Sequence, residues 1–281
     1  HIQADHSDQI QNGIDYIYAV PRMARYIEKS SDVISILLDF FSEEDIHVYS
    51  IDEAFVDLTT YLNYYKKTPI GLIEMVLATI KEKTGLFATA GIGPNFFLAK
   101  VALDIFAKKE PNGIATMTKD DIKTKLWPIK PLSKIWGIGP RMEARLNAIG
   151  ILTVKDLANS NLAYIKKHFG IMGEQLVNHA NGIDDSDIRE VYIPKDESLS
   201  IGQVLFKDYT IDEIPLIIKE MCDDLSQRLR LQNKLTSVVS LMIGYSKEGG
   251  FSRQASLINP TNESAILYET LMTIFNKHIK N

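Results

Sequence analysis

The 281-residue sequence predicts an α+β protein built from three parts. Strand and helix patterns alternate up to about residue 126, and a stretch with Pro and Gly then leads into an all-helical segment that ends near residue 182. After a polar linker, the pattern is strand, helix, strand, strand, helix. Alternating strands and helices are typical of an α/β layer, and the chain is long enough for two or three small cores. The predicted parts are residues 1–127, residues 128–188, a linker at 189–198, and residues 199–281.

The first part is expected to be an α/β layer. Apolar residues three and four positions apart predict helices, and short apolar runs predict strands. Gly85 is a stop signal for a helix, and Asp121 stands three residues after Thr118, which is the spacing of a capping box. The expected elements are a helix at 22–41, two short strands around Asp52 and Glu53, a helix at 69–83, a strand at 86–92, a helix at 96–107, a strand at 112–117 and a helix that starts at Thr118.

The third part is expected to be a small βαββα domain. The two middle strands should form a hairpin, because "KEGG" at 247–250 supplies the glycines of a tight turn. The expected elements are a strand at 199–206, a helix at 211–231, strands at 235–245 and 251–257, and a helix at 262–279.

Composition narrows the class of protein. The single cysteine, Cys222, excludes an internal disulfide and fits a reducing cytoplasm. No run of about 18 apolar residues exists, so no membrane span is expected. The net charge of −5 is unevenly distributed: residues 1–60 hold 3 Lys/Arg against 12 Asp/Glu, or −9, and residues 61–281 hold 28 against 24, or +4. Because local patches decide attraction to phosphates, the total charge does not exclude a nucleic-acid partner.

Two adjacent acids, Asp52 and Glu53, interrupt an apolar segment, "HVYSIDEAFVDLT". Neighbours in a regular strand point to opposite faces, so the two carboxylates can share a site only at an irregular point such as a hairpin tip. Without a counter-charge they would repel each other, and a divalent metal removes that repulsion. The alternative is a solvated turn, but the turn formers Gly, Asn and Pro are absent. The segment therefore predicts a magnesium site.

A second segment, "TAGIGPNFFLAKVALDIFAKKEPNGIA", combines a glycine turn with a helix and three lysines. Lys100, Lys108 and Lys109 could meet phosphates as mobile point charges. The glycines are a weak phosphate-loop signal, because the P-loop pattern is absent. By itself the segment favours a tight turn with solvated lysines.

The most specific sign of DNA binding is "LSKIWGIGPRMEARLNAIGILTVKDLA", with a Gly-Ile-Gly turn between helical patterns. The turn residues Gly137, Ile138 and Gly139 let the backbone approach a phosphate, and amides at the next helix start can donate to it. Arg141 and Arg145 lie one turn apart on that helix. Such contacts hold a DNA backbone without reading bases. The alternative is a helical hairpin that only builds a core.

Together these segments resemble the Y-family translesion DNA polymerases, in particular the UmuC-like, UV-damage-repair branch (ImpB/MucB/SamB) of Gram-positive bacteria. The matching segments are "YSIDEAFVDLT" for the catalytic palm signature, "TAGIGPN" to "PNGIA" for the second palm signature, "LSKIWGIGPRMEARLNAIGILTVKDLA" for the thumb helix-hairpin-helix, and "HANGIDDSDI" with "ESLSIGQVLF" for the passage to the little finger. The resemblance covers nearly the whole chain in order.

This resemblance implies a right-hand polymerase with a partial palm, a helix-hairpin-helix thumb and a C-terminally incomplete βαββα little finger. It implies an error-prone enzyme of DNA damage repair and the SOS response that joins dNTPs to a primer–template with two Mg²⁺ ions, for which Mn²⁺ can substitute. Asp52 would bridge both metals and Glu53 would hold the catalytic one. Lys108 or Lys109 would meet the triphosphate, and the sequence does not choose between them.

The resemblance further implies that residues 137–139 hold the duplex backbone and that Lys247 and Arg253 lie along the duplex on the little finger. The sliding clamp is an expected partner of the full-length protein, with no membrane partner. "GQVLF" at 202–206 faintly resembles a clamp motif, but a buried first strand is the favoured interpretation.

Several features of the family pattern are not found. These are the opening palm strand with its third carboxylate and steric gate, the fingers, the last little-finger strand and the clamp-binding tail. The chain also starts at His1 rather than Met. We therefore expect a truncated form that lacks templated synthesis.

Two other functions compete with the polymerase. One is a non-catalytic DNA-binding fragment or regulator that acts through the thumb and little finger. The other is a different palm enzyme, such as a cyclic-nucleotide synthase. That enzyme needs a Gly-Gly-acid-Glu-Phe turn, whereas this chain has Ser-Ile-Asp-Glu-Ala, and it leaves the helix-hairpin-helix unexplained.

Overall fold

The computed structural model describes residues 21–190, 197–205, 207–246 and 249–279, and the chain forms two compact units. The first unit runs from His1 to Tyr192 and the second from Ile193 to Asn281, so the division falls inside the segment predicted as the linker. The residues assigned to palm and thumb share the first unit, and the boundary between them at 127/128 stays a prediction. No helix in the described ranges is long and apolar enough to cross a membrane.

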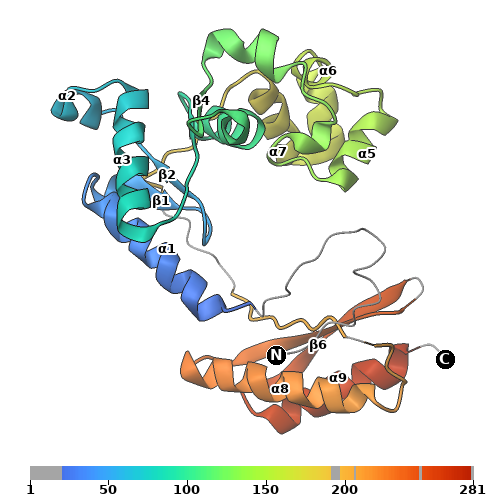
Figure 1. Ribbon diagram of the computed structural model, residues 1–281. Coiled ribbons are helices and arrows are strands. Elements are labelled where there is room, and N and C mark those ends of the chain that lie inside the picture. The colour runs from blue at the N-terminus through green and yellow to red at the C-terminus, as the bar shows by residue number, and fades with distance from the viewer. Residues whose placement is uncertain (1–20, 191–196, 206, 247–248, 280–281) are drawn as a thin grey trace, which may run out of the picture. The chain divides into compact units, whose positions relative to one another are not determined.

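The first unit begins with a helical layer packed on a short hairpin (Figure 1). Thr68 caps the start of helix α3 with a side chain that accepts the Gly71 N–H, and Gly85, with φ 73°, follows its last residue as the predicted stop. Its buried face holds Leu72, Val76 and Ile80 against the buried face of α1, which confirms the helical spacing. The elements are α1 Met23–Leu38, β1 Ile46–Val48, β2 Ala54–Val56, α2 Tyr61–Tyr65 and α3 Pro69–Thr84.

A second pair of strands follows, and it does not join the first. Strands β3 (Ala90–Ile92) and β4 (Ile114–Thr116) are parallel to each other, whereas β1 and β2 are antiparallel, so the described strands of this unit form two separate sheets. The alternating strands and helices expected of this α/β part are confirmed, but its described strands pair as two sheets and not as one. The strand predicted at 86–92 was also too long, because its first four residues are exposed and make no ladder.

Helix α4 (Phe96–Val101) begins at Asn95, whose side chain accepts the Leu98 N–H. It continues through a π-helical turn and a 3₁₀ turn to Lys109, which matches the helix predicted at 96–107. A capping box at Thr118 and Asp121 is formed as expected, and the backbone hydrogen bond from Thr118 lowers the pKa of Asp121 to about 2.

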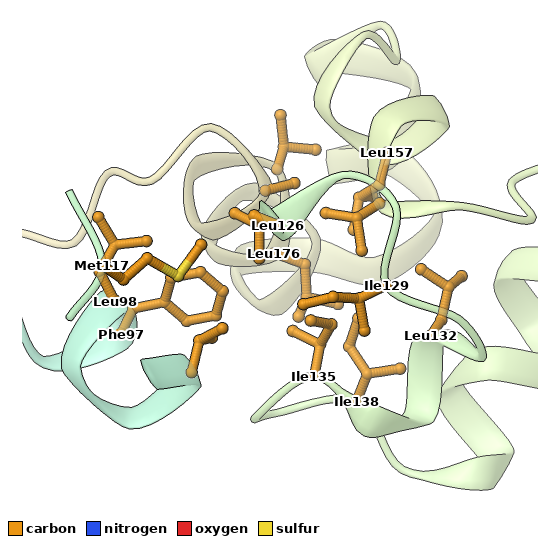
Figure 2. Packing of buried hydrophobic residues seen from close by; sticks show 14 of the residues in the cluster. Phe97, Leu98, Met117, Leu126, Ile129, Leu132, Ile135, Ile138, Leu157 and Leu176 are labelled. Atoms are coloured by element: carbon orange, nitrogen blue, oxygen red, sulfur yellow. The ribbon is translucent and has the colours of Figure 1, made fainter. Parts of the chain in front are cut away.

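The helical part of the first unit shares one core with α4 and β4. Phe97, Leu98 and Met117 from the strand–helix part lie beside Leu126 and Leu176 in Figure 2. These side chains are almost fully buried, and such burial is worth about 1.5–3 kcal/mol for each large apolar side chain. The helices are α5 Pro140–Ala148, α6 Val154–Ala158 and α7 Leu162–Ala180, with a break in α7 at Gly170.

The segment that follows α7 is hydrogen-bonded to the start of α4. The Asn95 amide donates to the Gly182 carbonyl at 2.9 Å, and the Phe97 N–H donates to Asp184 Oδ2 at 2.9 Å. Burial alone would raise the pKa of Asp184. His179 and hydrogen bonds from Ser186 and from the Phe97 N–H outweigh it and hold that pKa well below the usual range.

The second unit is a hairpin covered on one face by two helices (Figure 1). The predicted hairpin is confirmed, with Gly244 opposite Gly250 in antiparallel register. The strand predicted at 199–206 is not formed by the described residues 199–205. Leu199 packs on the core, but Val204 is 96% exposed, so this segment makes no buried ladder. The elements are α8 Ile214–Leu231, β5 Thr236–Gly244, β6 Gly250–Thr261 and α9 Ser264–His278.

Candidate active site and nucleic-acid interface

Asp52 and Glu53 lie in the turn that joins β1 to β2. The register pairs Val48 with Ala54, which leaves residues 49–53 as the tip. The N–H groups of Tyr49 and Ser50 both donate to the Glu53 carbonyl, at 3.0 and 3.1 Å, and close the turn. The Ser50 hydroxyl donates to Asp52 Oδ1 at 2.7 Å. The predicted hairpin bend at the acidic pair is therefore confirmed.

A lysine supplies the counter-charge that the sequence argument lacked. Lys100 Nζ lies 2.7 and 2.8 Å from the two carboxylate oxygens of Glu53, and its side chain is only 8% exposed. Nζ also donates to Asp104, one helical turn further on, at 3.2 Å. Burial alone would lower the pKa of Lys100, but the hydrogen bonds and charges of Glu53 and Asp104 raise it above its ordinary value. A metal is thus not the only means of compensating the charge of Glu53.

The three lysines of the second segment have different surroundings. Lys100 is paired and buried, so it is not a mobile phosphate ligand. Lys108 is 61% exposed and lies 3.9 Å from Asp104. Lys109 lines an open cavity of about 490 Å³ together with two further lysines, Lys130 and Lys134. Asp104 also lines this cavity, so Lys109 shares it with two lysines and one acid, whereas Lys108 does not line it.

The acidic turn can hold a divalent cation in part by itself. Asp52 is exposed, and Glu53 keeps 26% of its side-chain surface exposed despite its contact with Lys100. In the described ranges, no three Asp, Glu, His or Cys side chains gather in a way that could hold a metal. Magnesium typically uses one or two protein carboxylates, with waters and substrate phosphates as the other ligands, so the two acids fit it.

The glycines of the second segment have a packing role. A Cβ on Gly91 would lie 2.2 Å from the Ala99 carbonyl oxygen, and a Cβ on Gly93 would lie 2.5 Å from the Ala99 amide nitrogen. Only glycine lets β3 and its following turn approach α4 this closely. The turn favoured by the sequence is therefore explained without a phosphate.

The Gly-Ile-Gly turn leads into α5. Gly137 has φ 87°, a conformation that favours glycine, and Gly139 caps the helix with open space around its missing Cβ. Ile138 is buried, and its N–H donates to the Ile135 carbonyl at 3.0 Å. Ile138 therefore anchors the turn, whereas Gly139 and the first turn of α5 are the parts that a phosphate could approach.

The two arginines of α5 are not equivalent. Arg145 donates to the His168 carbonyl at 3.0 Å and lies 4.5 Å from the centre of the Phe169 ring. Arg141 lies one turn earlier, is exposed, and stands next to the Gly139 cap. Arg141 is thus the better candidate for a phosphate contact, and Arg145 helps to fix α7.

Arg253 lies on β6 opposite Leu241 of β5. Residues directly opposite each other share a face, and Leu241 is buried under the helices. Arg253 therefore lies on the helix-covered face of the hairpin. The open side carries uncharged residues such as Met242 and Gln254. Lys247, the other predicted contact of the little finger, lies outside the described residues.

The fold and the site together define a class of protein. A solved "Y-family DNA polymerase chimera Dbh-Dpo4(243-245)-Dbh" matches 96% of this chain and 77% of its own with a TM-score of 0.71 at 20% identity. A "Dbh Ternary Complex (substrates partially disordered)" matches 98% of this chain and 80% of its own with a TM-score of 0.53, also at 20% identity. At this identity the likeness establishes the fold, which is that of Y-family DNA polymerases.

Sequence comparisons identify the family. The impB/mucB/samB family profile matches residues 7–104, its C-terminal domain matches residues 196–281, and the IMS family HHH motif matches residues 119–151. "DNA repair protein homolog YobH" of Bacillus subtilis (strain 168) is 42% identical over 210 residues, which are 73% of this chain and 97% of that protein. The chain belongs to the impB/mucB/samB family.

Other relatives are longer. "Putative UV-damage repair protein UvrX" of Bacillus subtilis (strain 168) is 39% identical over 261 residues, and "DNA polymerase IV 2" of the same strain is 36% identical over 260. These alignments cover 92% and 91% of this chain. The chain spans 61% of the length of UvrX and 62% of that of DNA polymerase IV 2.

Sequence reasoning missed two residues that the structure connects to the acidic turn. Lys100 was considered only as a phosphate ligand, although its spacing of four from Asp104 signals an ion pair. Trp136 was quoted only as part of the thumb motif, and it contacts Tyr49 of the acidic turn.

Proposed function

We propose that this chain supplies the catalytic carboxylates, the thumb and the little finger of an error-prone translesion DNA polymerase of DNA damage repair and the SOS response. The observation that carries the proposal is the acidic turn at Asp52 and Glu53, which the fold places in contact with the helix-hairpin-helix through Tyr49 and Trp136. A reaction centre beside a backbone-gripping turn is what a polymerase needs, because the primer end must be held where the nucleotide is joined.

In the proposed reaction the primer 3′-hydroxyl attacks the α-phosphate of a dNTP, and pyrophosphate leaves. Asp52 and Glu53 would hold two Mg²⁺ or Mn²⁺ ions, which supply Lewis acidity and orient the reacting oxygens when bound. Lys100 keeps the Glu53 carboxylate in one place beside Asp52. The exposed Asp52 carboxylate remains available as the more accessible ligand.

Lys109 is our candidate for the triphosphate. It lines the cavity with Lys130, Lys134 and one acid, Asp104, whereas Lys108 is not among the residues that line it. Three lysines would attract a polyphosphate as point charges. The turn from Gly137 to Gly139, together with Arg141, would hold the duplex backbone.

The described residues place only two carboxylates at the turn, and one of these is shared with Lys100. We therefore propose that residues 1–281 by themselves extend primers weakly or not at all. The sliding clamp as a partner and the cytoplasm as the location belong to the same proposal. Family membership and the single, unpaired Cys222 support them.

A non-catalytic DNA-binding role is the second candidate. It is favoured by the pairing of Glu53 with Lys100, which lets the acidic turn exist without any metal. Of the relatives compared, YobH, whose length this chain matches almost completely, bears the name of a DNA repair protein homolog rather than of a polymerase.

One experiment separates the two roles. Binding of Mn²⁺ with dNTP is measured by electron paramagnetic resonance in the wild type and in Asp52→Asn, and primer extension on a lesion-bearing template is run beside it. We expect the wild type to bind Mn²⁺ with dNTP and Asp52→Asn to lose this binding. Duplex binding without any Mn²⁺–dNTP site in the wild type would refute the polymerase site and leave the binding role.

A further inference from the structure

Trp136 connects the Gly137–Gly139 turn, which is the proposed duplex contact of the thumb, to the acidic turn at Asp52 and Glu53. It directly precedes Gly137, and its indole N–H donates to the Tyr49 hydroxyl at 3.1 Å. The two rings meet edge to face, with centroids 5.8 Å apart and planes at 82°. This contact joins residues that are 87 positions apart in the chain.

Tyr49 in turn holds Glu53 by two routes. Its backbone N–H donates to the Glu53 carbonyl at 3.0 Å, which closes the acidic turn. Its ring lies 5.9 Å from Lys100 Nζ, and that ammonium grips both carboxylate oxygens of Glu53. A displacement of Tyr49 would therefore move both the backbone and the side-chain support of the acidic pair.

Trp136 is itself fixed from the thumb side. Its ring is parallel to the ring of His179, at 10° and 6.2 Å, and His179 stacks on Phe97 at 4.3 Å. Its neighbours Ile135 and Ile138 are both buried in the shared core. A shift of the glycine turn would therefore be transmitted through the indole to Tyr49, because Trp136 directly precedes Gly137 and donates to the Tyr49 hydroxyl.

We propose that Trp136 is a positioning residue that couples duplex binding at the Gly137–Gly139 turn to the geometry of Asp52 and Glu53. This rests on the proposed function, because it takes the acids as the metal ligands and the glycine turn as the duplex contact. The coupling is reciprocal: duplex DNA raises the affinity of the acidic turn for a divalent cation, and the cation raises the affinity for the duplex by the same factor. We expect a factor of about five, at the low end of such couplings, because one hydrogen bond and one ring contact carry it.

The first test uses Trp136 as its own reporter. The chain has two tryptophans, so Trp127→Phe leaves Trp136 as the only indole. Trp127 donates to the Ala180 carbonyl at 3.0 Å, so thermal unfolding of this background is checked first. We expect Trp136 fluorescence to change on addition of Mg²⁺ and, separately, of duplex DNA. Adding Asp52→Asn should remove the Mg²⁺ response and keep the DNA response.

The second test removes the link and keeps both ends. Tyr49→Phe deletes only the hydroxyl that accepts from Trp136. Mn²⁺ affinity is measured by electron paramagnetic resonance with and without saturating duplex, and the signal of Asp52→Asn is subtracted to remove Mn²⁺ held by the DNA. We expect the roughly fivefold gain to become clearly smaller in Tyr49→Phe, because the hydrogen bond is lost and only the ring contact remains, with Mn²⁺ affinity without DNA changed less than twofold. Tyr64→Phe, at an exposed tyrosine of α2, is the matched control and should keep the gain.

The outcomes distinguish this inference from the proposed function. If Mn²⁺ binds in the wild type and is lost in Asp52→Asn, but Tyr49→Phe keeps the whole gain, the coupling through Trp136 is refuted and the metal site stands. A Trp136 signal that responds to duplex and not to Mg²⁺, while Mn²⁺ is bound, refutes it as well. If the wild type binds no Mn²⁺ at the acids, the proposed function and the inference fail together.

Discussion

Replacing Lys100 with Met should destabilise the first unit by removing the positive charge between two carboxylates. Methionine keeps most of the length and apolar surface of the lysine side chain, so the change isolates the ammonium. Nζ lies 2.7 Å from Glu53 Oε1 and 3.1 Å from Asp104 Oδ2, and the Lys100 side chain is 8% exposed. Without Nζ, both carboxylates lose the hydrogen-bond donor that they share in a partly dry site.

The size of the effect follows from burial. Removing one partner of a fully buried ion pair costs about 3–5 kcal/mol. The side chains of Glu53 and Asp104 are 26% and 31% exposed, so water can solvate them in part, and we reduce the expected loss to about 2–3 kcal/mol. For a domain of this size, each kcal/mol shifts the melting temperature by about 2–4 °C, so the first unit should melt about 5–10 °C lower.

Differential scanning calorimetry would check this, and we expect the two compact units to unfold as separate transitions. Lys108→Met is the matched control on the same helical segment, and we expect it to stay within about 0.5 kcal/mol of wild type because Lys108 is exposed. Adding Glu53→Gln and Asp104→Asn to Lys100→Met should restore part of the stability, because no unpaired charge remains. A Lys100→Met protein as stable as Lys108→Met would refute the paired-ammonium interpretation.

Three further predictions concern the thumb and its attachment. Arg141→Ala should reduce the slope of log duplex affinity against log salt by about 0.9 without loss of stability, as anisotropy titrations at several salt concentrations would show. Arg145→Ala should also lower the melting temperature, as thermal unfolding would show, because Arg145 contacts His168 and Phe169. Gly139→Ala should fold normally and bind duplex more weakly, whereas Gly91→Ala should be strongly destabilised by its clash with α4, as circular dichroism would reveal. The lowered pKa of Asp184 gives stability that is present above about pH 4 and lost as the pH falls further, so Asp184→Asn should be less stable at pH 7 and change less between pH 5 and pH 2 in urea titrations.

The helices could be predicted because their signals are local. Each signal depends on residues at most four positions apart in the sequence. Examples are the cap of α3 at Thr68, its stop at Gly85 and the capping box at Thr118. The prediction of a strand at 199–206 was wrong for a physical reason that amino-acid composition does not reveal. An apolar run becomes a strand only when a neighbouring strand offers its backbone, and 199–205 gains burial for Leu199 without such a partner.

The residues of the acidic turn could be predicted from the sequence, whereas the ion pair that compensates the charge of Glu53 could not. The hairpin bend at Asp52 and Glu53 follows from strand periodicity, but the ion pair with Lys100 joins positions 47 apart and depends on how α4 packs against the hairpin. The position of Arg253 could have been seen earlier. It alternates with Phe251 and Ala255, so a period of two already places it on the apolar face.

The charge of the acidic site bears on how many cations it can hold. Asp52, Glu53 and Asp104 contribute three negative charges and the buried Lys100 one positive charge, so the formal charge is −2 when the exposed Lys108, 3.9 Å from Asp104, is left out. One divalent cation balances this, and a second would leave an excess of +2 unless the triphosphate of a nucleotide arrives with it. A Mn²⁺ titration of the unliganded chain should therefore level off at one ion for this site, and a titration with dNTP should reach two. Two ions bound tightly without nucleotide would show that Lys100 leaves Glu53 when the metal enters, and the lysine would then be a gate rather than a fixed support.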